Sequence, residues 1–224
     1  SQRWPIAEVL ALHEEDDSDA NIPLMVWYGV EPLIDDDPVR FAKLAGTSQL
    51  SVVRRHIARR VASLSPSDAG LARLAAGLAE AGDVNAQRDL LDGILAGLEG
   101  RRRVDLPDGW NTAYARLENS DSQDVRQRAV RLALVFDDQS ALFRLKTVAS
   151  DRSAKLSDRT LAIDALVARK VDDFASILLP LIDDAAVLPN VLRGLAEYDH
   201  PSTEQTILSR YDQMSATARQ QAIQ

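Results

Sequence analysis

Apolar positions along this chain recur at the three- and four-residue spacing of amphipathic helices. One stripe, in the segment 121–136, comprises Val125, Ala129, Leu132, Ala133 and Phe136. A stripe of this kind predicts a helix that buries one face. No alternating apolar and polar run bounded by turn residues predicts a strand. We therefore predict an all-α fold.

Capping residues and prolines set the expected helix boundaries. Asn21 and Pro23 predict one start, Glu31-Pro32 its end, and Asp37-Pro38 the next start. Gly82 is expected to stop a helix in the left-handed conformation. The expected helices are 6–13, 23–30, 38–44, 48–64, 66–81, 83–100, 109–119, 121–136, 138–150, 155–169, 171–182, 185–198, 201–211 and 215–224, with Ser48 opening the fourth and Ser65-Pro66 the fifth.

An arginine returns at the same point of successive helices, two positions before an apolar residue. The series is Arg55, Arg88, Arg128, Arg159 and Arg193, at separations of 33, 40, 31 and 34 residues. A drifting period of this size, carried by antiparallel helix pairs, is typical of an α-solenoid of HEAT-like (armadillo-like) repeats. We predict a right-handed superhelix of five or six pairs over residues 1–224. Each of these arginines is expected to bond an acid or a loop carbonyl of the neighbouring repeat.

Composition and charge exclude several classes of function. The 224 residues carry a net charge of -8, and aromatic residues make up only 5%. An acidic surface repels phosphate backbones, so we expect no nucleic-acid partner. There is no cysteine, which excludes disulfides, thiolate metal sites and covalent haem attachment in this chain. No run of 18 apolar residues occurs, so no membrane insertion is expected.

Two stretches carry a resemblance to a known family. They are DANIPLMVWYGVEPL, from Asp19 to Leu33, and VVRRHIARR, from Val52 to Arg60. Over residues 10–62 the chain resembles the HEAT-repeat segment of large exported proteins of planctomycete-type bacteria, the multidomain membrane-bound dehydrogenase and cytochrome-c-like haem-binding proteins. Residues 1–64 are the family-like part, and 65–224 continue the helical repeats.

The resemblance implies a context for the chain. In that family a sugar-dehydrogenase-like β-propeller precedes the helical segment, and a cytochrome-c-like domain with a Cys-x-x-Cys-His motif follows it. The resemblance thus implies an exported or periplasmic location and a non-catalytic scaffold between these two domains. This chain has no Cys-x-x-Cys-His, so no haem or other cofactor is expected on it. The expected partner is a protein, either another part of the parent chain or a separate one.

Two basic clusters are the candidate interaction surface. Arg54, Arg55, Arg59 and Arg60 lie on one helix, and Arg101, Arg102 and Arg103 lie in a loop. On a shared face they would bind an anionic or carboxylate-rich partner. HEAT-like DNA glycosylases use such a basic face, so an enzyme or enzyme accessory of that kind, or a bilin-lyase-like protein, is the alternative function.

The sequence contains no motif typical of a catalytic or metal-binding site. His13, His56 and His200 fall in unrelated repeats, so no zinc site is expected. The run Asp17-x-Asp19-x-Asn21 imitates a calcium loop, but Ile22 and Tyr28 stand where that loop needs Gly and Glu. No nucleophile elbow or phosphate-binding loop occurs. We therefore expect neither a catalytic nor a metal site.

The remaining expectations concern the core and the chain ends. Trp4, Trp27, Tyr28 and Trp110 are interpreted as core residues. The chain begins without Met and its last expected helix reaches Gln224, so we expect a segment of a longer protein. That last helix is expected to expose apolar surface, and two copies are expected to dimerise through the uncapped ends of the array.

Overall fold

The structure is a computed structural model that describes residues 3–64, 69–101 and 104–223, with the side chains of Gln221 and Ile223 excepted. In this described part all regular structure is helical, with fourteen α-helices, four short 3-10 helices and no strand. The all-α prediction is therefore confirmed. Contacts divide the chain into two compact units, Ser1–Asp138 and Gln139–Gln224.

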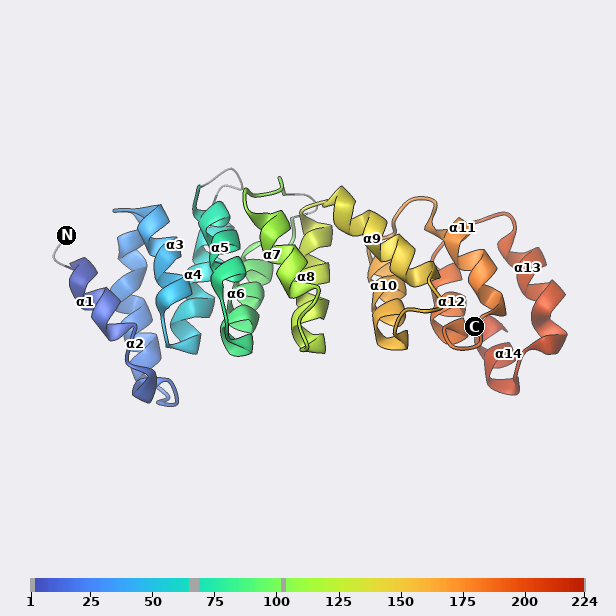
Figure 1. Cartoon of the computed structure of the whole chain (residues 1–224), viewed down its shortest axis with the longest axis horizontal. Coiled ribbons are helices and arrows are strands. Elements are labelled where there is room, and N and C mark those ends of the chain that lie inside the picture. Colours follow the sequence, from blue (N-terminus) through green and yellow to red (C-terminus); the bar gives the residue numbers. More distant parts are fainter. Residues whose placement is uncertain (1–2, 65–68, 102–103, 224) are drawn as a thin grey trace. The chain divides into compact units, whose positions relative to one another are not determined.

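Unit 1 contains eight described α-helices and two 3-10 helices. They are α1 (Arg3–Leu10), η1 (Glu14–Asp16), α2 (Ile22–Val30), η2 (Glu31–Ile34), α3 (Pro38–Thr47), α4 (Ser51–Ser63), α5 (Ala69–Glu80), α6 (Val84–Gly97), α7 (Trp110–Leu117) and α8 (Gln123–Val135). Consecutive helices form packed pairs, which stack in two layers (Figure 1). The helices α3, α5 and α7 follow one another in one layer, and α2, α4, α6 and α8 in the other.

The contact between α4 and α6 is the most extensive of the helix contacts in the described residues. Gly93 and Gly97 of α6 lie one turn apart and face Ala58 and Ala62 of α4. A Cβ atom on Gly93 would come within 2.6 Å of the Ala58 Cβ and would overlap the carbonyl oxygen of Arg55. Small residues on both helices therefore let the two backbones approach each other closely, with no room for a larger side chain.

Unit 2 contains six described α-helices and two 3-10 helices. They are α9 (Gln139–Ser150), α10 (Leu156–Ala168), α11 (Phe174–Leu178), η3 (Leu179–Asp183), α12 (Leu188–Leu195), α13 (Thr203–Arg210), η4 (Tyr211–Gln213) and α14 (Ala216–Ile223). The second helices of the pairs follow one another, since α10 packs on α12 and α12 packs on α14. The expected single helix over 171–182 is wrong. Pro180, which has no N–H to donate, lies inside the 3-10 segment η3 that replaces its second half.

Several expected helix boundaries are also wrong, because the caps come from elsewhere in the chain. Asn21 makes no side-chain cap; instead, the Asp19 Oδ1 atom accepts the N–H groups of Asn21 and Ile22, at 2.7 and 2.8 Å. Helix α4 begins at Ser51 rather than Ser48. The Ser51 N–H donates to Asp17, 34 residues earlier, at 2.6 Å.

The turn between α5 and α6 departs from expectation at Gly82, which is not in the left-handed conformation. The Gln87 side chain donates to the Ala81 carbonyl at 2.9 Å, so that carbonyl is satisfied without a left-handed residue. The start expected at Ser65-Pro66 lies outside the described residues. Asp37 and Asp83 do cap as predicted, accepting the N–H groups three residues on.

Three of the four aromatic residues assigned to the core are buried. Trp4, Trp27 and Trp110 are almost inaccessible to solvent, and the Trp110 indole donates to the Asp138 carboxylate at 3.0 Å. The expectation for Tyr28 is wrong, because this side chain is 67% exposed. Tyr28 lies on the face of α2 that no other described helix covers.

Candidate interaction surfaces

Ion pairs join the helices of one layer of unit 1. On α6, Arg88 and Asp92 lie one turn apart, and on α8 Asp124 and Arg128 lie one turn apart in the opposite order. Arg88 pairs with Asp124 at 3.1 Å, and Arg128 pairs with Asp92 at 2.5 Å and with Asp124 on its own helix. The hydrogen bond to Asp92, followed by that to Asp124, raises the pKa of the Arg128 guanidinium despite partial burial.

Arg54 makes the corresponding contact between α4 and α6, and it is buried. Its guanidinium donates to the Asp89 carboxylate at 3.0 Å and to the Ser48 carbonyl at 2.7 Å. The Arg54 and Asp89 side chains are only 8% and 9% exposed. Including Arg54 in an interaction surface was therefore wrong, because this arginine is used inside the helix stack.

The recurring arginines divide into two kinds. Arg88, Arg128 and Arg159 bind acids or carbonyls of neighbouring segments, as expected; Arg159, which is buried, pairs with Asp184 at 2.8 Å and donates to the Ala149 carbonyl. Arg55 and Arg193 are exposed and make no ion pair with the described residues. On α4 the inward-facing arginine is thus Arg54, one position before the member of the series.

The pKa of Asp184 reflects its contact with Arg159. Burial by itself would raise this pKa, but hydrogen bonds from Arg159 and from the Ala186 N–H, with the charges of Arg159 and Arg152, hold it below its usual value of 3.8. The carboxylate is therefore ionised in the folded unit, and the ion pair links α10 to the segment after η3.

The other arginines of the two predicted clusters lie together along α4. Arg55 and Arg59 lie on the solvent-facing side of this helix, and Arg60, the next residue, is half-exposed. Arg101 reaches its carboxyl end, where its guanidinium donates to the Ser63 and Leu64 carbonyls, both at 2.9 Å. Arg102 and Arg103 lie outside the described residues. We refer to Arg55, Arg59, Arg60 and Arg101 as the basic stripe.

The members of the basic stripe differ in how far their charges are neutralised. Arg60 lies 4.0 Å from Glu31, a loose contact between two half-exposed groups. Arg101 is engaged with the two carbonyls at the end of α4. Arg55 and Arg59 are exposed and make no ion pair with the described residues. The unneutralised charge of the stripe is therefore concentrated on these two side chains.

A polar pocket of about 580 Å³ lies at the amino ends of α4 and α6. Its wall includes Asp17, Ser51, Arg54, Asp83 and Asp89. Each of these groups already has a structural role, since Asp17 and Asp83 cap the two helices and Asp89 binds Arg54 and Ser51. These five polar side chains therefore hold helix ends in place.

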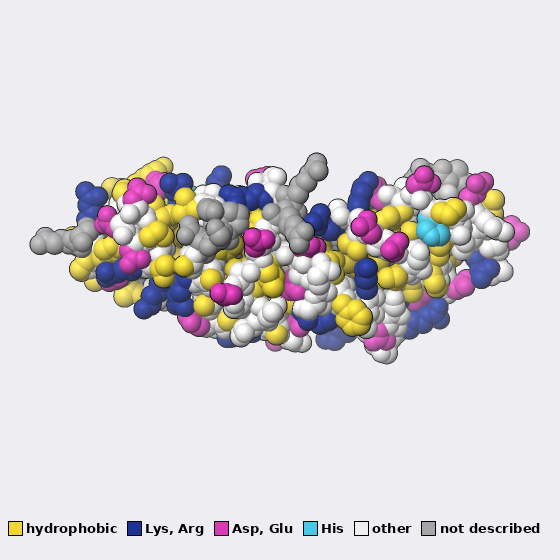
Figure 2. All heavy atoms as spheres, turned by 90° about the horizontal axis from the view of Figure 1, so that it is seen from above, with side chains coloured by type: hydrophobic (Ala, Val, Ile, Leu, Met, Phe, Trp, Pro, Cys, Tyr) yellow, Lys and Arg dark blue, Asp and Glu magenta, His cyan; other side chains and the backbone are white. Residues whose placement is uncertain are grey.

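An apolar groove of about 660 Å³ lies between α1 and α2. Ile6, Leu10, Ile22, Met25 and Tyr28 line it. Met25 is 69% exposed and Ile6 is 62% exposed, large values for apolar side chains. Figure 2 shows hydrophobic side chains at the surface of this end of unit 1.

The last helix presents a different surface from the one expected. In α14, within the described residues, no large apolar side chain is exposed, and Ala218 is buried. The side chain of Ile223 lies outside those residues. Among the described residues, exposed large apolar side chains are most concentrated on α1, α2 and the turn between them.

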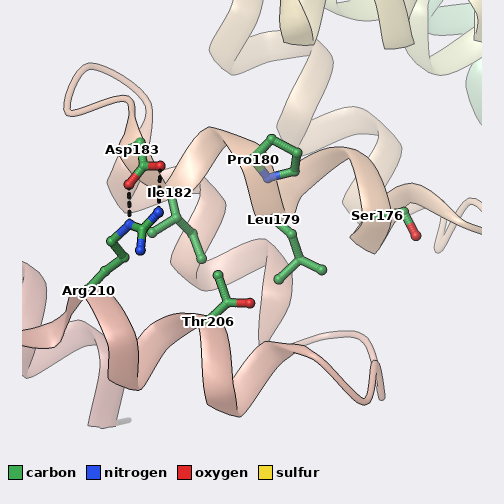
Figure 3. Close-up of a pocket in the computed structure, with 7 residues that line it drawn as sticks. All are labelled: Ser176, Leu179, Pro180, Ile182, Asp183, Thr206 and Arg210. Carbon is green, nitrogen blue, oxygen red and sulfur yellow. Dashed lines mark hydrogen bonds and ion pairs between the residues drawn. The ribbon is translucent and has the colours of Figure 1, made fainter.

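A smaller pocket in unit 2, of about 340 Å³, lies between η3 and α13 (Figure 3). Arg210 and Asp183 form a two-bond ion pair at one end of it, with contacts of 2.6 and 3.2 Å. The hydrogen bond from Arg210 holds the pKa of Asp183 below its usual value. Ser176 lies at the opposite end of the pocket, away from this pair.

Ser176 and His200 form a serine–histidine contact in the described residues, at 3.4 Å between Oγ and Nε2. The His200 Nδ1 atom accepts the Ser202 N–H at 3.2 Å. Neutral His200 therefore carries its proton on Nε2 and donates it toward Ser176. In this tautomer the histidine does not accept a proton from the serine, so the pair is not arranged for general-base catalysis.

The described residues contain no group of three or more His, Asp or Glu side chains placed to hold a metal ion. Among the helices that the structure describes, none combines the length and hydropathy needed to cross a bilayer.

Comparison with known proteins gives no match to a family model, to a curated protein or to a solved structure. Sequence reasoning missed the apolar groove, although one signal for it was available. The segment Ile22–Val30 contains no charged residue and is apolar on nearly every face. Within its layer of described helices α2 has a neighbour on one side, α4, so part of such a surface stays uncovered.

Proposed function

We propose that this chain is a non-catalytic scaffold that docks an acidic protein surface through the basic stripe of α4. In this proposal the stacked pairs form a right-handed α-solenoid of HEAT-like repeats, which holds the stripe rigid and extended. The observation that carries the proposal is the state of Arg55 and Arg59. Both are exposed and unpaired with any described residue, in a chain with eight more acidic than basic charges.

Electrostatics explains why these two arginines matter. An acidic protein supplies many carboxylates near its surface, and several arginines of unit 1, such as Arg40, Arg73 and Arg88, pair with them. Two neighbouring guanidinium groups left without an acid form a local positive site, which orients and accelerates the approach of a carboxylate-rich partner. Arginine also suits this role because its planar group binds carboxylates with two parallel hydrogen bonds.

A protein partner fits these charges better than a nucleic acid does. Nucleic-acid affinity grows with the number of phosphates that cations neutralise. Here the described stripe offers two uncompensated cations against a net charge of -8. Two such groups are sufficient to orient a protein interface, whose rim is polar and whose charges act mainly on the association rate.

The family resemblance supplies the cellular context of the proposal. In this context the chain lies in a periplasmic or exported protein, between a sugar-dehydrogenase-like propeller and a c-type cytochrome domain. The acidic surface would then belong to one of these neighbouring domains. The scaffold would hold the oxidising domain and its electron acceptor at a fixed separation, without taking part in electron transfer itself.

The test is a binding measurement with charge-reversed variants of the full chain. The native reading frame is sequenced on both sides, the domains it encodes are expressed separately, and their affinity for this chain is measured at low and high salt. We expect Arg55→Glu/Arg59→Glu to weaken binding by about tenfold or more and to reduce its salt dependence. The control is Arg131→Glu/Arg193→Glu, which makes the same charge change at two exposed arginines elsewhere.

Three outcomes would overturn the proposal. The first is that the reading frame encodes no further domain and that, in the source cells, a photo-crosslinker placed at position 59 forms no crosslink to any protein. Another is binding that both double variants weaken equally, since net charge alone would then explain it. The third is tight binding of a short DNA duplex, lost in Arg55→Glu/Arg59→Glu, which would favour the glycosylase-like alternative.

A further inference from the structure

No described element of unit 1 covers an apolar face formed by α1 and α2. The groove between the two helices is flanked by further exposed apolar side chains on the same helices and the turn after α1. Their positions are Ile6, Val9, Leu10, Leu12, Ile22, Leu24, Met25 and Tyr28. We refer to these eight side chains as the α1–α2 face. Among the described helices, α4 and α6 have neighbours on both sides in their layer, whereas α2 has one on the side of α4 alone.

The size of the α1–α2 face is that of a stable protein interface. At about 200 Å² for a fully exposed large side chain, the exposed fractions of its eight members amount to roughly 850 Å². The largest apolar patch on a typical monomer covers about 300–600 Å². A standard interface buries about 800 Å² on each partner. The face therefore exceeds what a monomer normally exposes and matches one side of a dimer.

The charges around the face favour a second copy as the occupant. Helix α2 contains no Asp, Glu, Lys, Arg or His, so two such faces meet without like charges at their centre. Arg3 lies at the amino end of α1 and lines the groove. The acidic turn after α1, which includes Glu15, lies at the other end. In an antiparallel pairing the acidic end of each face therefore meets the basic end of the other.

We propose that the chain forms a two-fold symmetric dimer through its α1–α2 faces. Met25 and Tyr28 lie at the centre of the interface, where large side chains exclude water and contribute most to affinity. Arg3 of each copy lies near Glu15 of the other copy at the rim. The contact is isologous, so it closes after two copies and leaves both basic stripes outside the apolar contact. The inference does not depend on the proposed docking function, because the two surfaces comprise different residues.

Sedimentation of the full chain tests the dimer. Over about 1–200 µM protein we expect a reversible monomer–dimer equilibrium. Met25→Glu/Tyr28→Glu should raise the dissociation constant by at least about 100-fold, because it places four carboxylates inside the contact. The matched control is Phe143→Glu/Leu208→Glu in unit 2, which changes two equally exposed apolar residues and should leave the equilibrium unchanged. Circular dichroism confirms that each variant is folded.

Charge exchange tests the antiparallel arrangement. Arg3→Glu and Glu15→Arg should each weaken the dimer by about three- to tenfold, and the double variant should restore it. A strict monomer at the highest concentration overturns the proposal. A dimer that survives Met25→Glu/Tyr28→Glu places the contact elsewhere and also overturns it. Failure of the double exchange to restore affinity overturns the antiparallel geometry. If a flanking domain binds the face and releases monomers, that domain is the occupant and the proposal is wrong.

Discussion

Replacement of Gly93 by alanine is expected to destabilise the protein, against the usual effect of this substitution in a helix. In the interior of a helix, alanine is more favourable than glycine by about 1 kcal/mol. At Gly93, however, the added Cβ would lie 2.6 Å from the Ala58 Cβ and would overlap the Arg55 carbonyl oxygen. Both obstacles belong to the backbone or first side-chain atom of α4, so neither can rotate away.

The magnitude follows from these two opposing effects. Forcing a methyl group into a filled contact costs about 1–3 kcal/mol, and at Gly93 the upper part of that range applies because α4 and α6 must separate. After subtraction of the helix-propensity gain, Gly93→Ala should lower the free energy of unfolding by about 1–2 kcal/mol. Gly97→Ala should behave alike, with its Cβ 2.7 Å from the Ala62 Cβ.

The matched control is Gly77→Ala, also at a close contact between two helices. There the new Cβ would lie 4.0 Å from the Gly46 Cα, an ordinary van der Waals distance, so about 0.4–1 kcal/mol of stabilisation is expected. Urea unfolding, monitored by circular dichroism, gives the free energy of unfolding of both variants when the slope of that free energy against urea concentration is the same. If Gly93→Ala were as stable as the wild type or more so, the close approach of α4 and α6 would be refuted.

Three further expectations concern charged groups. Asp89→Ala should cost about 3–5 kcal/mol because it leaves Arg54 charged and buried, whereas Arg54→Met/Asp89→Leu should recover most of that loss in a double-mutant cycle of urea unfolding. The lowered pKa of Asp184 means that its ion pair stabilises the fold above about pH 4 and that this contribution is lost as the pH falls below 3.8. In Arg159→Gln, burial should raise that pKa, so urea midpoints at neutral and at acid pH should lie closer together than in the wild type. Asp37→Ala removes the cap of α3 and should lower the free energy of unfolding by about 1 kcal/mol, and an unchanged value would contradict the capping contact.

The helices were predictable from sequence because the information that specifies them is local. Asp37 and Asp83 cap the helices that immediately follow them, and the amphipathic stripes mark the buried faces. The start of α4 was not predictable in this way. Its first N–H group donates to Asp17, which lies 34 residues earlier in the sequence, and no local pattern at Ser48 reveals that contact.

The candidate surface was predictable only in part. A run of two arginines shows that charge is present, but a one-residue difference on a helix turns a side chain by about 100°. Arg54 thereby faces Asp89 in the core while Arg55 faces solvent. Tyr28 was misplaced for a related reason. An all-apolar helix predicts burial on every side, yet burial requires a neighbour on every side, and in the described part of the chain α2 has no neighbour in its layer opposite α4.

The two ion pairs between α6 and α8, with opposite charge order on the two helices, fix how these helices align along their length. Arg88 precedes Asp92 on one helix, and Asp124 precedes Arg128 on the other. If α8 slid by one turn in one direction, Arg128 would face Arg88; in the other direction, Asp124 would face Asp92. Both displacements, of about 5.4 Å, create a repulsion in place of two attractions. Apolar stripes tolerate such a slip, whereas these four charges permit a single register.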